Sequence, residues 1–313
     1  MDTNENEAVT QTPDRTGSRC GFVALIGAPN VGKSTLVNAL VGSKVTIVSK
    51  KVQTTRALIR GIVIDDNAQI ILVDTPGIFL PKRRLDRAMV KTAWSGAHDA
   101  DVVCVLLDAK AGLDDEAQAI LERVGQVDHP KILVINKIDL VLREKLLSLT
   151  QRANERLKFD ETFMVSAMSG DGVEDLKHEL AKRVPDGPFH YPEDQMSDAP
   201  LRHLAAEITR EKIYRHLHQE LPYQSTVETD SWTERKDKSV RIEQTIFVER
   251  DSQRKIVLGK GGATIKAIGA DSRKEIAEIV GEKVHLFLFV KVRDGWGDDP
   301  ERYREMGLEF PKE

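Results

Sequence analysis

Residues 22–41 read FVALI, GAPNVGKS and TLVNALV, which predict a buried strand, a glycine-containing loop and the start of a helix. A GxxxxGKS loop between a strand and a helix is typical of a phosphate-binding loop. Its glycines let backbone N–H groups surround phosphate oxygens, which also face the positive end of the helix dipole. An ordinary turn would need neither the Lys-Ser pair nor both glycines at this spacing. The contacts predicted here are Gly27, Ala28, Pro29, Asn30, Val31, Gly32, Lys33, Ser34 and Thr35.

Short apolar runs alternate with amphipathic segments of helical length from Phe22 to about Val184. This alternation predicts an α/β domain, in which helices cover both faces of a mostly parallel sheet. One pair of runs, ALIRGIVID and QIILVD, is joined only by a short turn around Asp66 and Asn67. Because so short a connection cannot hold a crossover, this pair is predicted to form an antiparallel hairpin at the sheet edge.

Three further segments indicate which nucleotide the loop binds. DTPG at 74–77 follows a strand, so the Asp74 carboxylate can hold magnesium through water and the Gly77 N–H can contact the terminal phosphate. NKID at 136–139 follows the next-but-one strand, and the Asp139 carboxylate can accept two hydrogen bonds from guanine, whereas adenine has no donor there. After TFMV, a backbone N–H at 166–167 can donate to guanine O6. These segments add Asp74, Thr75, Pro76, Gly77, Ile78, Asn136, Lys137, Ile138, Asp139, Ser166 and Ala167 as predicted GTP contacts.

These motifs, in this order on this strand pattern, resemble a translation-factor-type GTPase domain of the Ras-like fold. In that family a threonine from a mobile loop closes the magnesium site when GTP is bound. The matching segment is QTTR at 53–56, where Thr55 is favoured over Thr54. The resemblance therefore implies catalytic roles for Lys33 and Thr55 in Mg²⁺-dependent GTP hydrolysis. The implied magnesium ligands are Ser34, Thr55 and Asp74.

Two positions modify what the resemblance implies. The family's water-positioning glutamine is replaced by Ile78, whose aliphatic side chain cannot orient water, so we expect slow turnover without a built-in arginine finger. Asn30 corresponds to a residue that helps to hold a potassium ion beside the phosphates in some relatives. The hypothesis is that K⁺ stimulates turnover more than Na⁺ does.

A second module follows the Pro-, Asp- and Gly-containing segment 185–200. Its pattern predicts a helix over 201–219, two strands, a short helix, a longer helix and a last strand. GKGG at 259–262 forms a GxxG turn between the two later helices, where a sugar-phosphate chain can approach the backbone. This order of elements resembles a bacterial-type (type II) KH domain, which implies single-stranded RNA as the ligand.

The charge pattern independently favours an RNA site at that turn. Residues 201–313 contain 21 basic and 21 acidic residues, but residues 250–274 hold seven basic residues against two acidic ones. Positive charge is therefore concentrated where a phosphodiester chain would lie. The predicted RNA-binding residues are Arg254, Lys255, Gly259, Lys260, Gly261, Gly262 and Lys266.

Together the two modules resemble the Era-like subfamily of bacterial GTPases over roughly residues 20–295. This resemblance implies a slow GTP/GDP switch that binds the 3′ end of 16S rRNA and assists maturation of the 30S ribosomal subunit. It also implies a cytoplasmic monomer with a fraction at the cytoplasmic face of the cell membrane. The predicted domains are a flexible polar tail (1–20), the GTPase domain (21–184), a linker (185–200), the KH domain (201–295) and a C-terminal tail (296–313).

Composition agrees with a cytosolic protein. The net charge of −4 shows no global attraction for polyanions, and Cys20 and Cys104 lie far apart along the chain. No apolar run approaches the roughly 18 residues of a membrane-spanning helix, and residues 1–20 lack the apolar centre of a signal peptide. Two alternatives remain open at this point. The second module could be a protein-interaction scaffold, or the chain could be an ATP-dependent transferase with a coincidental NKID.

Overall fold

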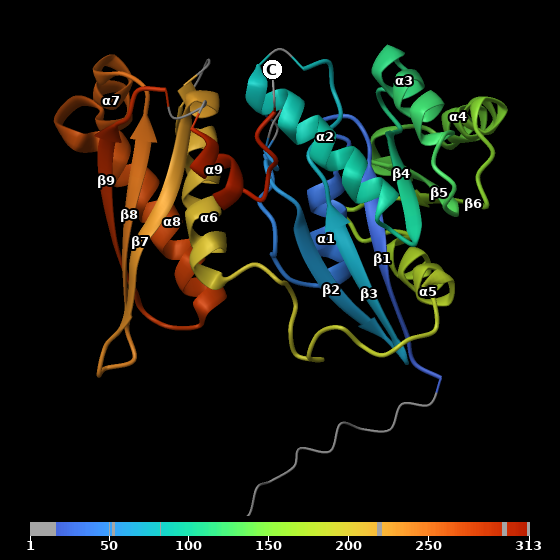
Figure 1. The fold of residues 1–313 in the computed structure, drawn as a ribbon, viewed down its shortest axis with the longest axis horizontal. Helices are drawn as coiled ribbons and strands as arrows, with labels where there is room; N and C mark the ends of the chain where they lie inside the picture. Colours follow the sequence, from blue (N-terminus) through green and yellow to red (C-terminus); the bar gives the residue numbers. More distant parts are fainter. Residues whose placement is uncertain are drawn as a thin grey trace, which may run out of the picture.

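The computed structural model describes residues 17–49, 51, 54–81, 83–217, 221–295 and 299–311. It contains a six-stranded sheet of order β2-β3-β1-β4-β5-β6 and a three-stranded sheet of order β7-β8-β9 (Figure 1). Residues 1–16 of the predicted tail, Gln53 of QTTR and the last two residues of the predicted helix 201–219 lie outside the described ranges. Within those ranges, no helix combines the length and the apolar character that crossing a membrane requires.

The first domain is a Ras-like α/β layer structure. Its strands are β1 (Arg19–Ile26), β2 (Ile59–Asp65), β3 (Ala68–Asp74), β4 (Val102–Asp108), β5 (Lys131–Asn136) and β6 (Glu161–Val165). Its helices are α1 (Lys33–Val41), α2 (Arg84–His98), α3 (Asp115–Val124), α4 (Arg143–Arg156) and α5 (Val173–Arg183), with the 3-10 turn η1 (Ile138–Leu140).

The central strands are apolar on both faces because both faces are covered. Val23 and Leu25 of β1 pack with α1 and α5, whereas Ala24 and Ile26 pack with α2, α3 and α4. All strand pairs of this sheet are parallel except β2 with β3. That pair forms the predicted edge hairpin, in which Asp65 lies opposite Ala68 across the turn.

The second domain has the predicted order of elements. It comprises α6 (Leu201–His216), the 3-10 turn η2 (Leu221–Gln224), β7 (Ser225–Glu234), β8 (Val240–Val248), α7 (Asp251–Leu258), the turn η3 (Lys260–Gly262), α8 (Ala263–Val280) and β9 (Val284–Val292). β8 pairs antiparallel with β7 and parallel with β9. The core lies between this sheet and its helices, where Ile213 of α6, Ile246 of β8 and Ile268 of α8 are fully buried.

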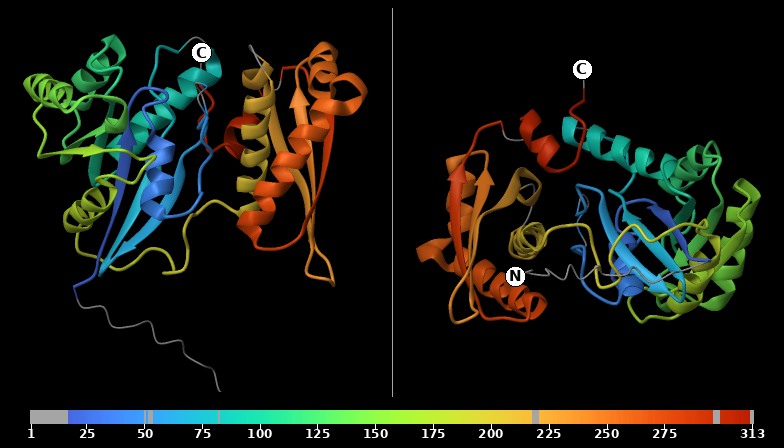
Figure 2. Two further views of the ribbon diagram at one scale, coloured as in Figure 1. Left: turned by 180° about the vertical axis from the view of Figure 1, so that it is seen from behind. Right: turned by 60° about the horizontal axis from the view of Figure 1, so that its bottom comes forward.

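Residues 300–311 belong to the predicted C-terminal tail, for which the sequence indicated no structure. They form α9 (Pro300–Glu305) and a short extension, which pack against α2 of the first domain (Figure 2). Tyr303 and Leu308 are 0% and 3% exposed beside Leu85 and Met89. The sequence pattern missed this contact because a six-residue helix carries too little periodicity to predict a buried face. Residues 303–310 therefore pack against the first domain.

Helix α6 lies on the side of the second domain that faces the first domain (Figure 1). The segment that leads from α1 to β2 runs against it. Ile47 of this segment is fully buried with Leu204 and Ile208 of α6, and Lys44 forms ion pairs with Glu211 of α6 and Glu275 of α8. This segment contains Thr54 and Thr55, so the interface between the domains adjoins the predicted magnesium site.

Candidate functional site

The phosphate-binding loop lies between β1 and α1, and its shape depends on Gly32. This residue has φ +101°, and a Cβ there would lie 2.3 Å from the Asn136 side-chain nitrogen, so only glycine fits. Lys33 is 6% exposed, and its ammonium donates to the carbonyls of Gly27 (3.1 Å) and Ala28 (3.0 Å). Burial lowers the pKa of Lys33 to about 8, although the nearby Asp74 charge acts in the opposite direction.

The three predicted magnesium ligands converge at the end of β3. Ser34 Oγ donates to Asp74 Oδ2 (2.8 Å) and lies 2.9 Å from Thr55 Oγ1, which itself donates to the same carboxylate oxygen (3.2 Å). Thr46 also donates to Asp74 Oδ2 (2.9 Å), a contact that no sequence motif indicated. Thr54 instead donates to the Lys51 carbonyl (2.7 Å), so Thr55 is the threonine of the pair that reaches this site.

The Asp74 carboxylate is the acidic group at the centre of this cluster of hydroxyls. Its side chain is fully buried, and Oδ1 has no hydrogen-bond partner among the residues that the structure describes. Burial raises the pKa of Asp74, while Lys33 and the three hydroxyl donors act against that rise. The Asp74 carboxylate and the hydroxyls of Ser34 and Thr55 are oxygen ligands, and such a set suits a hard divalent cation such as Mg²⁺. The residues present therefore fit the ion that the motif implies.

The NKID segment is joined directly to the phosphate-binding loop. Asn136 Nδ2 donates to the Val31 carbonyl (2.8 Å), and Lys137 Nζ donates to the Asn30 carbonyl (2.5 Å). Lys137 also forms an ion pair with Asp108 (2.6 Å). The Asp139 side chain lies in η1, directly after these anchors, and is exposed. The two segments therefore meet on one side of the sheet, as a shared nucleotide requires.

The predicted donor to guanine O6 is already engaged within the protein. The Ala167 N–H donates to Asn136 Oδ1 (3.0 Å), and the Ser166 N–H donates to the Asp171 carbonyl (2.9 Å). Asn136 Oδ1 also accepts the Lys137 N–H (2.8 Å). Asn136 thus connects β5, the loop after β6 and the phosphate-binding loop, a bridging role that the sequence analysis missed. The NKID motif itself was the signal that could have indicated it.

The DTPG segment passes close to the phosphate-binding loop. The Ile78 N–H donates to the Gly27 carbonyl (3.1 Å), and the Thr75 hydroxyl donates to the Leu25 carbonyl (2.6 Å). The Ile78 side chain is 8% exposed and belongs to the apolar core beneath α2, α3 and α4. It cannot position a water molecule, because it has no polar atom and points into that core.

The GxxG turn projects from the second domain. Gly261 has φ +61°, and an added Cβ there would meet no heavy atom within 4 Å, so the turn combines a left-handed backbone with open space. The predicted basic residues are exposed around it. These are Arg254 and Lys255 on α7, Lys260 in the turn and Lys266 on α8. Ile256, which follows Lys255 in α7, has an apolar side chain that is 56% exposed. The surface thus offers cations for a phosphodiester chain beside an apolar contact for a base.

Sequence comparison identifies both domains. The family described as 50S ribosome-binding GTPase matches residues 22–137, and the KH domain family matches residues 220–297. GTPase Era of Afipia carboxidovorans is 83% identical over 296 residues, covering 95% of this chain and 96% of that protein. GTPase Era of Bradyrhizobium diazoefficiens is 81% identical over 307 residues, covering 98% and 99%.

Two solved structures resemble this chain in fold along nearly its whole length. A crystal structure of Era in complex with MgGDPNP and nucleotides 1506–1542 of 16S ribosomal RNA has a TM-score of 0.88 at 36% identity. The match covers 93% of this chain and 99% of that one. A variant of Aquifex aeolicus Era bound to GDP and AlF4⁻ has a TM-score of 0.87 at 37% identity, covering 92% and 99%. The chain therefore belongs to the Era family of GTPases, which are P-loop enzymes that hydrolyse GTP.

Proposed function

We propose that this GTPase is a slow molecular switch that binds the single-stranded 3′ end of 16S rRNA through its KH domain and assists maturation of the 30S subunit. The observation that supports this most is the similarity, over 93% of the chain, to Era in complex with MgGDPNP and 16S rRNA nucleotides. The proposal includes the cellular setting that the family resemblance implies, a cytoplasmic monomer with a fraction at the membrane surface.

The residues of the nucleotide site have separate proposed tasks: binding Mg²⁺, contacting the phosphates and recognising the base. Ser34, Thr55 and Asp74 hold Mg²⁺, which neutralises phosphate charge when bound. The Lys33 ammonium exchanges its two carbonyl partners for outer phosphate oxygens and stabilises charge there as the terminal bond breaks. The exposed Asp139 carboxylate accepts hydrogen bonds from guanine. Turnover is slow, because the aliphatic Ile78 cannot orient the attacking water.

Potassium is proposed as a further cofactor of the phosphate-binding loop. Asn30 is exposed there with φ +61°, and its carbonyl accepts a hydrogen bond from Lys137. GTP turnover measured in matched K⁺ and Na⁺ buffers should be faster in K⁺. Equal rates would remove potassium from the proposal without affecting the rest of it.

In the KH domain, Arg254, Lys255, Lys260 and Lys266 neutralise RNA phosphates while the glycines of the turn allow close backbone approach. Four such contacts to a single strand predict that the logarithm of the RNA affinity falls with the logarithm of the salt concentration, with a slope of about −3. A protein-scaffold role for this domain would not produce that slope.

The proposal is tested by filter binding of a single-stranded oligonucleotide from the 3′ end of 16S rRNA. Changing Lys260→Asp and Gly261→Asp together should abolish measurable binding, because two negative charges then face the phosphates. The matched control is Lys236→Asp, which makes the same Lys-to-Asp change on the exposed turn between β7 and β8. RNA affinity unchanged by the double variant would favour the protein scaffold instead.

A further inference from the structure

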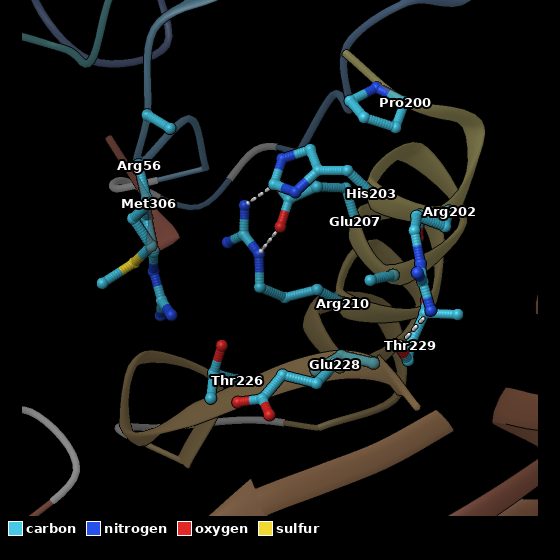
Figure 3. A pocket seen from close by; sticks show the side chains of 13 residues that line it. Arg56, Pro200, Arg202, His203, Glu207, Arg210, Thr226, Glu228, Thr229 and Met306 are labelled. Carbon is cyan, nitrogen blue, oxygen red and sulfur yellow. Dashed lines mark hydrogen bonds and ion pairs between the residues drawn. The ribbon is translucent and has the colours of Figure 1, made fainter. Parts of the chain in front are cut away.

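A cavity lies between the two domains, and Arg56, the residue after Thr55, lines it. This cavity, of about 430 Å³, is lined by residues of the first domain, α6, β7 and the C-terminal extension. Figure 3 shows Arg56 entering it from the first domain, while Arg210 and Glu207 extend from α6 and Glu228 from β7. The magnesium-site threonine is thus adjacent in sequence to the wall of an interdomain cavity.

Arg56 is buried, with 4% of its surface exposed, and its guanidinium reaches into the second domain. Nη1 donates to the Ser225 carbonyl (3.0 Å). Nη2 donates to the Tyr214 hydroxyl (3.2 Å) and to the carbonyls of Tyr223 (3.2 Å) and Pro222 (3.3 Å). Each of these acceptors belongs to the KH domain. A buried guanidinium that lost these acceptors would be left desolvated without compensation, so Arg56 is held firmly in this place.

The residue on the other side of Thr55 is held from the same domain. Arg210 Nη2 donates to the Thr54 carbonyl, and the Arg210 side chain, 1% exposed, is itself fixed by Glu207 on the preceding turn of α6. Thr55 therefore lies between two residues whose positions the KH domain sets. Since adjacent Cα atoms are only about 3.8 Å apart, fixing both neighbours leaves Thr55 little freedom of its own.

We propose that Arg56 is a positioning residue, through which the KH domain places the Thr55 hydroxyl at the magnesium site and so sets the preference for GTP over GDP. This inference rests on the magnesium role proposed for Thr55. The Arg56 guanidinium hydrogen-bonds to the KH domain and acts on Thr55 through the backbone that joins the two residues. The KH domain thereby contributes to nucleotide discrimination before any RNA is bound.

The test compares the affinities of the full chain for GDPNP and for GDP, each with Mg²⁺, by titration calorimetry. Arg56→Ala should weaken GDPNP binding about tenfold, the effect of losing hydrogen bonds to a charged group, and should leave GDP binding within about twofold. Arg56→Lys replaces the planar guanidinium by a single ammonium group, so its GDPNP affinity should lie between those of the unaltered protein and Arg56→Ala. The matched control is Arg60→Ala, which removes an arginine of β2 paired with Asp198 (2.7 Å) and should alter neither affinity.

Two further variants separate positioning from general damage. Tyr214→Phe removes one acceptor of the Arg56 guanidinium, and the substituted residue lies in the KH domain. This variant should weaken GDPNP binding about threefold and leave GDP binding unchanged. Arg56→Ala should have no additional effect in a Thr55→Ala background, because its action passes through that hydroxyl. Equal losses for GDPNP and GDP, or fully additive effects in the Thr55→Ala background, would overturn the inference. If Thr55→Ala alone left the GDPNP affinity intact, the proposed magnesium role of Thr55 would fall as well.

Discussion

The side-chain amide of Asn136 donates a hydrogen bond to the Val31 carbonyl (2.8 Å) and so joins the NKID segment to the phosphate-binding loop. Its Oδ1 also accepts the N–H groups of Lys137 and Ala167. Asn136 is 1% exposed, and without it the Val31 carbonyl and the Ala167 N–H would stay buried and lose these hydrogen bonds.

Asn136→Ala should therefore lower the free energy of unfolding by about 3 kcal/mol, measured by urea denaturation. The control is Asn154→Ala on α4, where the amide donates to the Thr150 carbonyl one turn earlier, and where the expected loss is below about 1 kcal/mol. Similar losses for the two variants would contradict a bridging role for Asn136.

Asp139→Asn should exchange guanine for xanthine specificity. In its proposed role the carboxylate accepts hydrogen bonds from two guanine donors, whereas an amide presents one donor and one acceptor, which suits xanthine. Calorimetry should show GTP affinity reduced about a hundredfold and xanthosine triphosphate affinity increased. Unchanged GTP binding would show that the base is read elsewhere.

Much of the fold follows from local patterns. The hairpin of β2 and β3 was predicted because the turn at Asp66 is too short for a crossover, and the strand ends at Asp74 and Asn136 follow from apolar runs that stop at motif residues. What local patterns could not provide was contact between distant segments. Arg56 meets Tyr214 across 158 positions of sequence. No periodicity encodes such a pairing, which depends on how the two sheets are placed relative to each other.

The contact of α9 with α2 shows the same limit and yields a prediction. Tyr303 is fully buried against the helix that follows DTPG, so Tyr303→Ala should cost about 3 kcal/mol of stability in urea denaturation. The control is Glu309→Gln in the same segment as Tyr303. It removes an exposed ion pair with Lys91 of α2 and should not measurably change the free energy of unfolding. A silent Tyr303→Ala would mean that this segment contributes little to stability.

The pH dependence of one surface contact can be predicted in direction. Asp65 accepts a hydrogen bond from His178 Nδ1 (2.7 Å), and this bond and its charge raise the pKa of His178 above the usual 6.5. Glu174 adds to the rise, and Lys177 opposes it. The contact therefore stabilises the fold fully below pH 6.5 and stops doing so as the pH rises through the raised pKa. NMR titration should place the His178 midpoint above 6.5, and Asp65→Asn should return it toward that value. An identical midpoint in both proteins would refute the pairing.

The proposed switch function and the proposed role of Arg56 together predict that the nucleotide bound beside Thr55 changes how tightly RNA binds at the proposed site around residues 259–262. The most direct test of this prediction is the affinity of the full chain for the single-stranded 3′ end of 16S rRNA, measured with GDPNP and with GDP. We predict binding at least about tenfold tighter with GDPNP, a coupling of typical allosteric size. We also predict that Arg56→Ala removes most of that difference. Equal RNA affinities with the two nucleotides in the unaltered protein would contradict the account.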